Sequence, residues 1–169
     1  MGDTDAAFTA YATARAPALR RTAYLLCGDW HLAEDLVQTT LTKLYLAWGR
    51  VERRNEIDAY VRRVLARSWI DETRRSSHRE VVTATAPEVE VAGPDLDDRV
   101  VLLRALDEVP PGQRLVLVLR FWDDLSIAET AAALGCSEGN VKSQAARGLE
   151  ALRRQLARAG VVVAATEES

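Results

Sequence analysis

The chain has 169 residues, of which 48% are hydrophobic and 28% are charged, and its formal net charge is −3. This composition is typical of a globular protein and excludes a disordered chain. The net negative charge argues against a free-standing, high-affinity nucleic-acid binder, because such affinity comes mainly from cations that displace counterions from phosphates. We find no secretory signal and no apolar run near the roughly 18 residues of a membrane helix, so we expect a cytoplasmic protein without membrane contact.

Catalytic and metal-binding patterns are missing from the sequence. Cys27 and Cys136 are far apart and belong to no C-x-x-C or Cys/His cluster, which predicts two small buried residues in a reducing compartment. His31 and His78 are isolated, and no Ser/His/Asp set or glycine-rich phosphate loop is present. We therefore expect no metal, no cofactor and no enzymatic activity.

Charge is distributed unevenly along the chain. Residues 62–79 carry a net charge of +4, residues 80–98 carry −6, and residues 142–158 carry +4. The acidic segment contains two prolines and one glycine and lacks a helical apolar period. This composition predicts a flexible linker over residues 80–98.

The first part of the chain, residues 1–79, has the periodicity of amphipathic helices. We expect helices over Pro17 to Leu26, Leu32 to Trp48 and about Asp58 to Arg75, with a polar loop from Gly49 to Ile57. The apolar stripe of the second helix consists of Leu32, Leu36, Val37, Leu41, Leu44, Tyr45 and Trp48.

We also predict helices for the last part of the chain, residues 99–158, and we assign residues 159–169 to a tail. Helices are expected over Arg99 to Glu108 and Gly112 to Trp122, followed by two more within Ser126 to Leu156. Ser126 and Glu129 fit the capping box that begins a helix. Gly135 is placed to end that helix, and Ser137 is placed to cap the next one. The sequence therefore predicts an all-α fold of two small helical domains joined by the acidic linker.

Two helices separated by a short turn with a glycine are typical of a helix-turn-helix, whose second helix enters the DNA major groove. Side chains on the polar side of that second helix can read base edges or contact phosphate. These candidate DNA-contacting residues are Lys142, Ser143, Gln144, Ala146 and Arg147. An ordinary helical hairpin with a solvated basic face is the alternative.

The basic helix of the first domain is open to two interpretations. Its arginines could simply be solvated, or they could form a cationic groove beside aromatic rings that stack on exposed bases. Trp48, Tyr60 and Trp69 lie on or beside this helix, although a tryptophan on a helix is more often part of the core. The candidate strand-opening residues are Tyr60, Arg62, Arg63, Arg67 and Arg74.

Three segments resemble conserved parts of bacterial sigma factors of the sigma-70 family. The run 33–38, Ala-Glu-Asp-Leu-Val-Gln, resembles region 2, and residues 58–67 look like its promoter-melting, −10-reading helix. Residues 125–143 resemble region 4, the −35-reading helix-turn-helix. Both regions around a linker look like the extracytoplasmic-function (ECF) class, and residues 24–29 are similar to its SigE-like subgroup.

The resemblance implies a sigma factor that brings core RNA polymerase to promoter DNA. It places the β′ clamp helices of polymerase on the 32–48 helix, and the −35 element on the helix-turn-helix. It places the −10 element on the Gly49–Ile57 loop together with the basic helix. It places the β flap against the 99–122 helices. The implied polymerase-binding residues are Asp35, Leu36, Gln38, Thr39 and Thr42. An anti-sigma factor is a further candidate partner, because many relatives are held inactive by one.

Three departures affect the promoter preference that can be inferred. Many members of the family carry Asn where Arg67 stands, which leaves the preferred −10 base open. Many carry Arg where Gln144 and Leu149 stand, so the −35 sequence does not carry over. The alternative function is a conventional helix-turn-helix regulator with a helical partner-binding domain. That alternative accounts for the last part of the chain but leaves the 33–38 helix and the acidic linker without a role.

Overall fold

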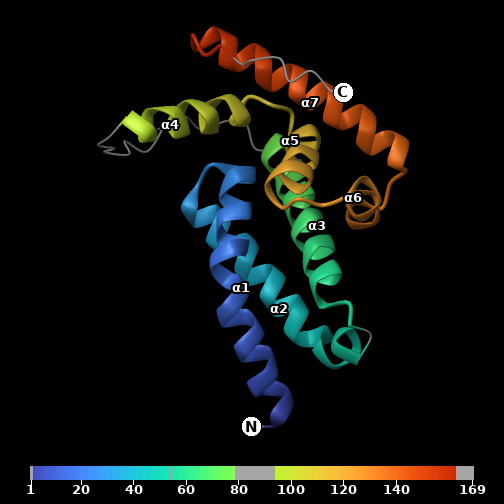
Figure 1. Ribbon diagram of the computed structural model, residues 1–169. Coiled ribbons are helices and arrows are strands. Elements are labelled where there is room, and N and C mark those ends of the chain that lie inside the picture. Colours follow the sequence, from blue (N-terminus) through green and yellow to red (C-terminus); the bar gives the residue numbers. More distant parts are fainter. Residues whose placement is uncertain (1, 54, 79–93, 163–169) are drawn as a thin grey trace.

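The computed structural model describes residues 2–53, 55–78 and 94–162, and every regular element within these residues is helical (Figure 1). This confirms the predicted all-α class. The elements are α1 (Asp3–Cys27), α2 (Trp30–Arg53), α3 (Ile57–His78), α4 (Pro94–Asp107), α5 (Pro111–Leu117), the π-helical turn η1 (Val118–Trp122), α6 (Ile127–Leu134) and α7 (Glu138–Arg158). None of these helices is long and apolar enough to cross a membrane.

Helices α1, α2 and α3 pack side by side into a bundle (Figure 1). At the end of the bundle away from α7, Leu44, Trp48, Val51 and Val61 form one buried cluster. Phe8 and Tyr11 of α1 close this cluster with tilted or edge-on ring contacts to Trp48, at centroid distances of 5.5 and 5.7 Å. Trp48 is therefore a core residue.

Two helices are longer than the sequence indicated. The first begins at Asp3 rather than Pro17, and Pro17 lies inside it. Its early turns are stabilised by tertiary contacts, since Phe8 and Tyr11 pack on α2, and Asp3 and Asp5 suit the positive end of the helix dipole. The second continues through Gly49 to Arg53, so the predicted polar loop from Gly49 is wrong over most of its length. Helix α2 continues past Gly49 because Val51, which is 2% exposed, packs in the core, and another helical turn is needed to bring it there.

The C-terminal helices run from α4 to α7, and α7 crosses the end of the bundle (Figure 1). Helix α4 begins at Pro94, five residues before the predicted start, so the last residues assigned to the linker are helical. Proline is favoured in the first turn of a helix because its missing N–H has no intrahelical partner there. The rest of the predicted linker, residues 80–93, lies outside the described residues, as does the tail beyond residue 162.

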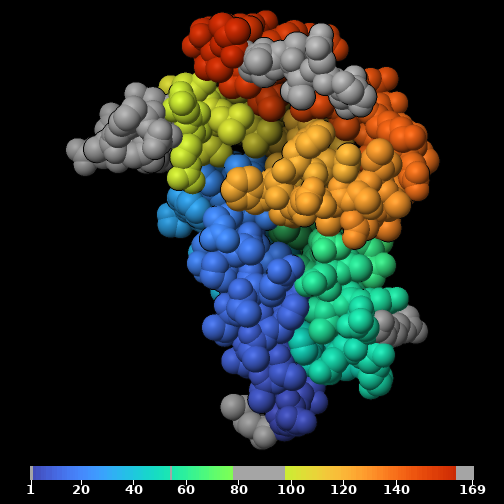
Figure 2. All heavy atoms as spheres, viewed as in Figure 1, coloured from blue at the N-terminus to red at the C-terminus, as the bar shows by residue number. Residues whose placement is uncertain are grey.

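The helices before and after the predicted linker share one continuous core. This was not expected from the prediction of two small domains joined by a flexible linker. Ala23, Leu26, Leu36 and Trp69 from the first group belong to the same buried cluster as the C-terminal helices. The C-terminal contributors are Leu106, Val109, Leu115, Leu117, Val118, Leu119, Leu125, Ala133 and Ala151. In Figure 2 the orange surface that includes α6 lies directly against the green surface of α3, in agreement with the packing of the two helices.

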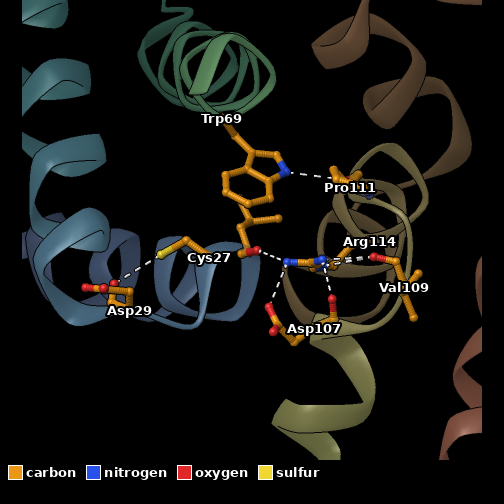
Figure 3. A network of polar contacts seen from close by, with 8 residues as sticks. Cys27, Asp29, Trp69, Asp107, Val109, Pro111 and Arg114 are labelled. Atoms are coloured by element: carbon orange, nitrogen blue, oxygen red, sulfur yellow. Dashed lines mark hydrogen bonds and ion pairs between the residues drawn. The ribbon is translucent and has the colours of Figure 1, made fainter. Parts of the chain in front are cut away.

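A buried arginine lies at the centre of this shared core (Figure 3). The side chain of Arg114 in α5 is 7% exposed and donates hydrogen bonds to three carbonyl oxygens, those of Leu26, Asp107 and Val109, at 2.6–2.9 Å. It also contacts the Asp107 carboxylate at 3.4 Å and lies over the Trp69 ring. Burial lowers the pKa of Arg114. The Leu26 carbonyl belongs to the last turn of α1, where carbonyls have no intrahelical partner.

Candidate nucleic-acid interface

The predicted helix-turn-helix is present with the predicted caps. Ser126 Oγ accepts a hydrogen bond from the Glu129 N–H at 3.0 Å, and the Glu129 carboxylate accepts one from the Ser126 N–H at 2.8 Å. Gly135 ends α6 in the left-handed conformation, with φ of 65°. Ser137 Oγ accepts from the Asn140 N–H at 3.1 Å and begins α7. These local contacts set the turn between the two helices.

Helix α7 exposes most of the predicted −35 residues. Lys142, Ser143, Ala146 and Arg147 are exposed, whereas Gln144 is half-buried. On the opposite side, Val141 is fully buried. The exposed residues include two cations, a hydroxyl and a small side chain, which together can contact phosphate and base edges.

Gly148 sets how closely α7 approaches α5, and sequence reasoning missed it. A Cβ atom at this position would lie 3.0 Å from Leu117 Cγ and 3.3 Å from Gln113 Cβ. The buried side of α7 therefore includes Gly148 and Ala151 as well as part of the predicted stripe. The available signal was that a glycine lies inside a long amphipathic helix, where it is unfavourable unless close packing requires it.

The candidate −10 residues do not form a single cluster. Along α3, Arg62 and Arg63 are half-buried, while Arg67 and Arg74 are exposed. Tyr60 and Arg74 lie 14 residues apart, which is about 21 Å along a helix axis. The structure thus places Tyr60 near the start of α3 and Arg74 close to its other end. Trp69, at 5% exposure, is a core residue and cannot be a stacking surface in this arrangement.

A cationic hollow lies where α2 ends and α3 begins. Its volume is about 500 Å³, and Tyr60 is one of its lining residues. The Arg50 guanidinium lies over the Tyr60 ring at 5.8 Å, and the Tyr60 hydroxyl donates to the Lys43 carbonyl at 3.4 Å. Arg53 also lines the hollow. The resemblance had assigned the segment with Arg50 and Arg53 to the −10 element, but as a loop, and no individual residue of it was named. Lys43 was not singled out, although it lies within the predicted 32–48 helix.

The candidate polymerase-binding residues on α2 divide into exposed and buried ones. Asp35, Gln38, Thr39 and Thr42 are exposed and recur at helical spacing along one side of α2. Leu36 is 4% exposed and belongs to the shared core. Its side chain therefore supports the helix from inside and presents little surface to a partner.

Next to this side of α2 lies a second hollow of about 340 Å³ between α2 and α3. Asp35 and Thr39 line it from α2, and Ser68, Glu72 and Arg75 line it from α3. The polar residues of α2 and those of α3 thus line one shared surface. A partner helix lying along α2 could reach both helices.

The two cysteines are free and half-buried. Among the described residues, no group of three or more His, Cys, Asp or Glu side chains is arranged to hold a metal ion. Burial raises the pKa of the Cys27 thiol from its ordinary 9.0 to about 11, and the thiol donates a hydrogen bond to the Asp29 carbonyl at 3.1 Å.

The raised pKa of the Cys27 thiol predicts that the protein loses stability at alkaline pH. The unfolded thiol ionises near pH 9 and the folded thiol near pH 11, so the stability that depends on the neutral thiol is lost as pH rises through this range. We expect the free energy of unfolding to fall between pH 9 and 11, and to fall less steeply in Cys27→Ala. Urea denaturation at a series of pH values measures both slopes, and parallel curves would contradict the prediction.

Comparisons with known proteins identify the family. Residues 11–79 match the family described as Sigma-70 region 2, and residues 99–152 match that described as Sigma-70, region 4. The RNA polymerase sigma-E factor of Streptomyces coelicolor is 40% identical over 151 residues, which are 88% of this chain and 85% of that protein. The chain belongs to the sigma-70 family of RNA polymerase sigma factors.

Further relatives support the same subgroup. The ECF RNA polymerase sigma factor SigE of Mycolicibacterium smegmatis is 31% identical over 147 residues, covering 82% of this chain and 57% of that protein. The sigma factor RpoE of Bartonella quintana, in complex with the anti-sigma factor NepR, matches with a TM-score of 0.71 and 25% identity. This match covers 89% of this chain and 96% of that chain.

Family membership assigns the helices of this sigma factor to regions. Region 2 corresponds to most of α1 with α2 and α3, and the match to region 4 includes most of α4, all of α5, η1 and α6, and most of α7. The function of the chain is accordingly promoter-directed transcription initiation. A conventional regulator with an unrelated partner-binding domain is not favoured, because both sigma regions match in their order along the chain.

Proposed function

We propose that this sigma factor acts in the cytoplasm, without catalysing a reaction, by binding core RNA polymerase through α2 and reading promoter DNA with α3 and α7. The observation that carries the proposal is the presence of two separate cationic surfaces on region 2 and region 4 of one family member. The hollow beside Tyr60 is one surface, and the exposed side of α7 is the other.

On region 2, the proposed docking surface for the β′ clamp helices is the exposed polar side of α2. Asp35, Gln38, Thr39 and Thr42 keep this surface soluble before it is covered, as suits an interface that forms only transiently. Leu36 contributes by holding α2 in the core.

The hollow between α2 and α3 is our proposed site for a base of the opened −10 element. Arg50 and Arg53 supply positive charge for the strand backbone, and the Tyr60 ring offers an aromatic surface. Single-stranded nucleic acid is commonly held by this combination of a cationic groove and aromatic rings. Arg62, Arg63, Arg67 and Arg74 would extend the cationic path along α3.

On region 4, we propose that α7 reads the −35 element through its exposed N-terminal half. Lys142, Ser143, Ala146 and Arg147 lie on the open side of that half, and the half-buried Gln144 lies beside them. The α4 and α5 helices then support α7, as the Gly148 contact with Leu117 shows for α5, and they are our proposed docking surface for the β flap.

An anti-sigma factor is a further proposed partner. The support is the structural match to a sigma factor that is bound to an anti-sigma factor, over most of both chains. The part of the predicted linker that precedes α4, residues 80–93, is proposed to pass through the polymerase cleft, where its acidic side chains would resemble a nucleic-acid strand.

The proposal is tested by adding the purified chain to sigma-free core polymerase and mapping transcripts from genomic fragments. We expect RNA synthesis to start at defined sites only when both components are present. Defined complexes between DNA and the free chain, with no initiation after addition of core, would instead support a conventional regulator.

Arg147→Ala is the corresponding test of the α7 surface. A bidentate contact from Arg147 predicts a loss of about 1–3 kcal/mol in −35-dependent initiation, which is roughly 5- to 150-fold. The matched control is Arg153→Ala, since Arg153 is also exposed on α7 but lies outside the proposed contact set. Run-off transcription from a mapped promoter measures both variants, and equal losses would remove Arg147 from the −35 contact.

A further inference from the structure

The start of α3 is held from two sides. Asp58 and Tyr60 belong to its first turn, and a spacing of two residues points their side chains in nearly opposite directions on a helix. Tyr60 faces α2, where its hydroxyl donates to the Lys43 carbonyl and its ring lies beside the Arg50 guanidinium. Asp58 faces α1, which meets α2 and α3 at this end of the bundle (Figure 1).

Two side chains of α1 converge on the Asp58 carboxylate. The Tyr11 hydroxyl donates to Asp58 Oδ1 at 2.6 Å, and the Arg15 guanidinium donates to the same oxygen at 3.2 Å. A hydroxyl–carboxylate distance of this length is typical of strong, charge-assisted hydrogen bonds. The Arg15 and Asp58 side chains are 47% and 50% exposed, so their ion pair is screened by solvent. Tyr11 is therefore the stronger of the two supports.

Tyr11 is itself fixed by the core of the bundle. Its ring packs on Trp48 at a centroid distance of 5.7 Å, beside the buried cluster that joins the three helices. Burial and the hydrogen bond to Asp58 raise the pKa of the Tyr11 hydroxyl to about 12. The hydroxyl thus stays protonated and able to donate at neutral pH. Tyr11 links the core directly to the first turn of α3.

The residues that precede α3 tie its start to α2 but leave its rotation open. Asn55 has a left-handed backbone with φ of 53°, which asparagine adopts more readily than most residues. The Glu56 N–H donates to the Val51 carbonyl in the last turns of α2 at 3.1 Å. These contacts fix where α3 begins. Rotation of its first turn about the helix axis is opposed on the α1 side by the contacts of Asp58.

We propose that Tyr11, assisted by Arg15, is a positioning residue for promoter opening: by holding Asp58, it sets the Tyr60 ring at the cationic hollow. This inference rests on the proposed function of that hollow as the site for a base of the −10 element. Neither Tyr11 nor Arg15 lines the hollow, so their effect passes through α3. Without the Tyr11 hydroxyl, the first turn of α3 can rotate, and the Tyr60 ring is less well placed to stack on a base.

Tyr11→Phe tests the proposal, because it removes the hydroxyl and keeps the ring. We expect holoenzyme assembled from this variant and core polymerase to form open complexes at a mapped promoter about three- to tenfold more slowly, since a net hydrogen bond is worth roughly that factor. Permanganate reactivity of unpaired thymines in the −10 element measures opening. An unchanged rate would overturn the proposal.

Tyr45→Phe is the matched control. The Tyr45 hydroxyl donates to the Asp5 carboxylate at 3.1 Å, so the same exchange removes a tyrosine–aspartate hydrogen bond that joins α2 to α1 and does not involve α3. We expect an unchanged rate of opening in this variant. Circular dichroism melting establishes that both variants are folded. Equal losses in the two variants would contradict a specific role of Tyr11.

Asp58→Ala tests whether Tyr11 acts through Asp58. If it does, Tyr11→Phe has nothing further to remove once Asp58 is alanine, and the double variant should open the promoter as fast as Asp58→Ala alone. Independent effects would multiply instead. Multiplied losses in the double variant would therefore refute the proposed link between the two residues.

The promoter base supplies a readout that a loss of stability alone would not move. Each non-template position of the −10 element is made abasic in turn, and the largest loss of opening with the unmodified chain identifies the captured base. We expect the same abasic site to cost Tyr11→Phe less, because a misplaced ring gains less from stacking on the base. An equal cost in both proteins would count against the positioning role.

Tyr60→Ala separates failure of this inference from failure of the proposed function. Normal opening by folded Tyr60→Ala would show that the hollow is not the site of the base, and the inference would fall with it. Slow opening by Tyr60→Ala together with normal opening by Tyr11→Phe would leave the hollow in place and refute only the role of Tyr11.

Discussion

Replacement of Arg114 by leucine is expected to lower the free energy of unfolding by about 3–5 kcal/mol, because each buried acceptor left without a donor costs about 1–3 kcal/mol. Three carbonyls, those of Leu26, Asp107 and Val109, receive hydrogen bonds from this guanidinium. These carbonyls are main-chain groups, and leucine offers them no donor. Water would have to enter the core to satisfy them. Urea denaturation followed by circular dichroism measures the change.

Arg104→Leu is the control for this prediction. Arg104 is exposed on α4, and removing a surface charge away from special features usually changes stability by less than about 0.5 kcal/mol. Equal stability of Arg114→Leu and Arg104→Leu would contradict the prediction, because it would mean that these carbonyls do not depend on the buried guanidinium. The contact of region 4 with the end of α1 would then depend on apolar packing alone.

Trp48→Ala is expected to lower the free energy of unfolding by about 3–5 kcal/mol, as is typical when a large buried aromatic side chain is truncated. Trp48 is 3% exposed and packs against the rings of Phe8 and Tyr11. Its loss removes the largest side chain of the cluster that joins the early turns of α1 to α2 and α3. We also expect the first turns of α1 to lose hydrogen-exchange protection, because the Phe8 and Tyr11 rings lose their contacts with Trp48.

Trp30→Ala is the matched tryptophan control. Trp30 is 49% exposed and stacks on Tyr24 at 3.9 Å, so its truncation is expected to cost about 1 kcal/mol. If Trp48→Ala instead kept full stability but lost promoter opening, Trp48 would be a base-stacking surface and not a core residue. That outcome would contradict the packing described above.

The sequence was most informative where structure depends on neighbours a few positions apart. The capping box of Ser126 and Glu129, the left-handed Gly135 and the cap at Ser137 were all predicted and all occur. Each involves contacts over three or four residues, so a short stretch of sequence contains all the groups that take part.

Helix ends that depend on distant packing were predicted poorly. The start of α1 was predicted at Pro17, yet Phe8 and Tyr11 stabilise the preceding turns through contacts with α2. The loop assigned from Gly49 is largely helix for a similar reason, since Val51 packs in the core. That error also concealed the hollow containing Arg50 and Arg53.

Candidate site residues were placed correctly where the helix periodicity was followed, and wrongly where it was not. Ser143 and Arg147 were placed opposite an apolar stripe and are exposed. Leu36 was assigned to the polymerase-binding surface although it also belonged to the apolar stripe, and it is buried. For a leucine on an amphipathic helix, the periodicity was the better guide, because burial of apolar area dominates over other uses of the side chain.

By itself, the sequence determined the helical class, the order of the two sigma regions and the caps of the helix-turn-helix, because local propensity, periodicity and motif spacing are properties of short segments. Only the tertiary structure decided that the regions share a core, that the Thr22 hydroxyl donates to the Asp123 carboxylate and that Arg114 reaches the end of α1. Those contacts join residues 88 and 101 positions apart, and no local pattern specifies which distant surfaces will meet.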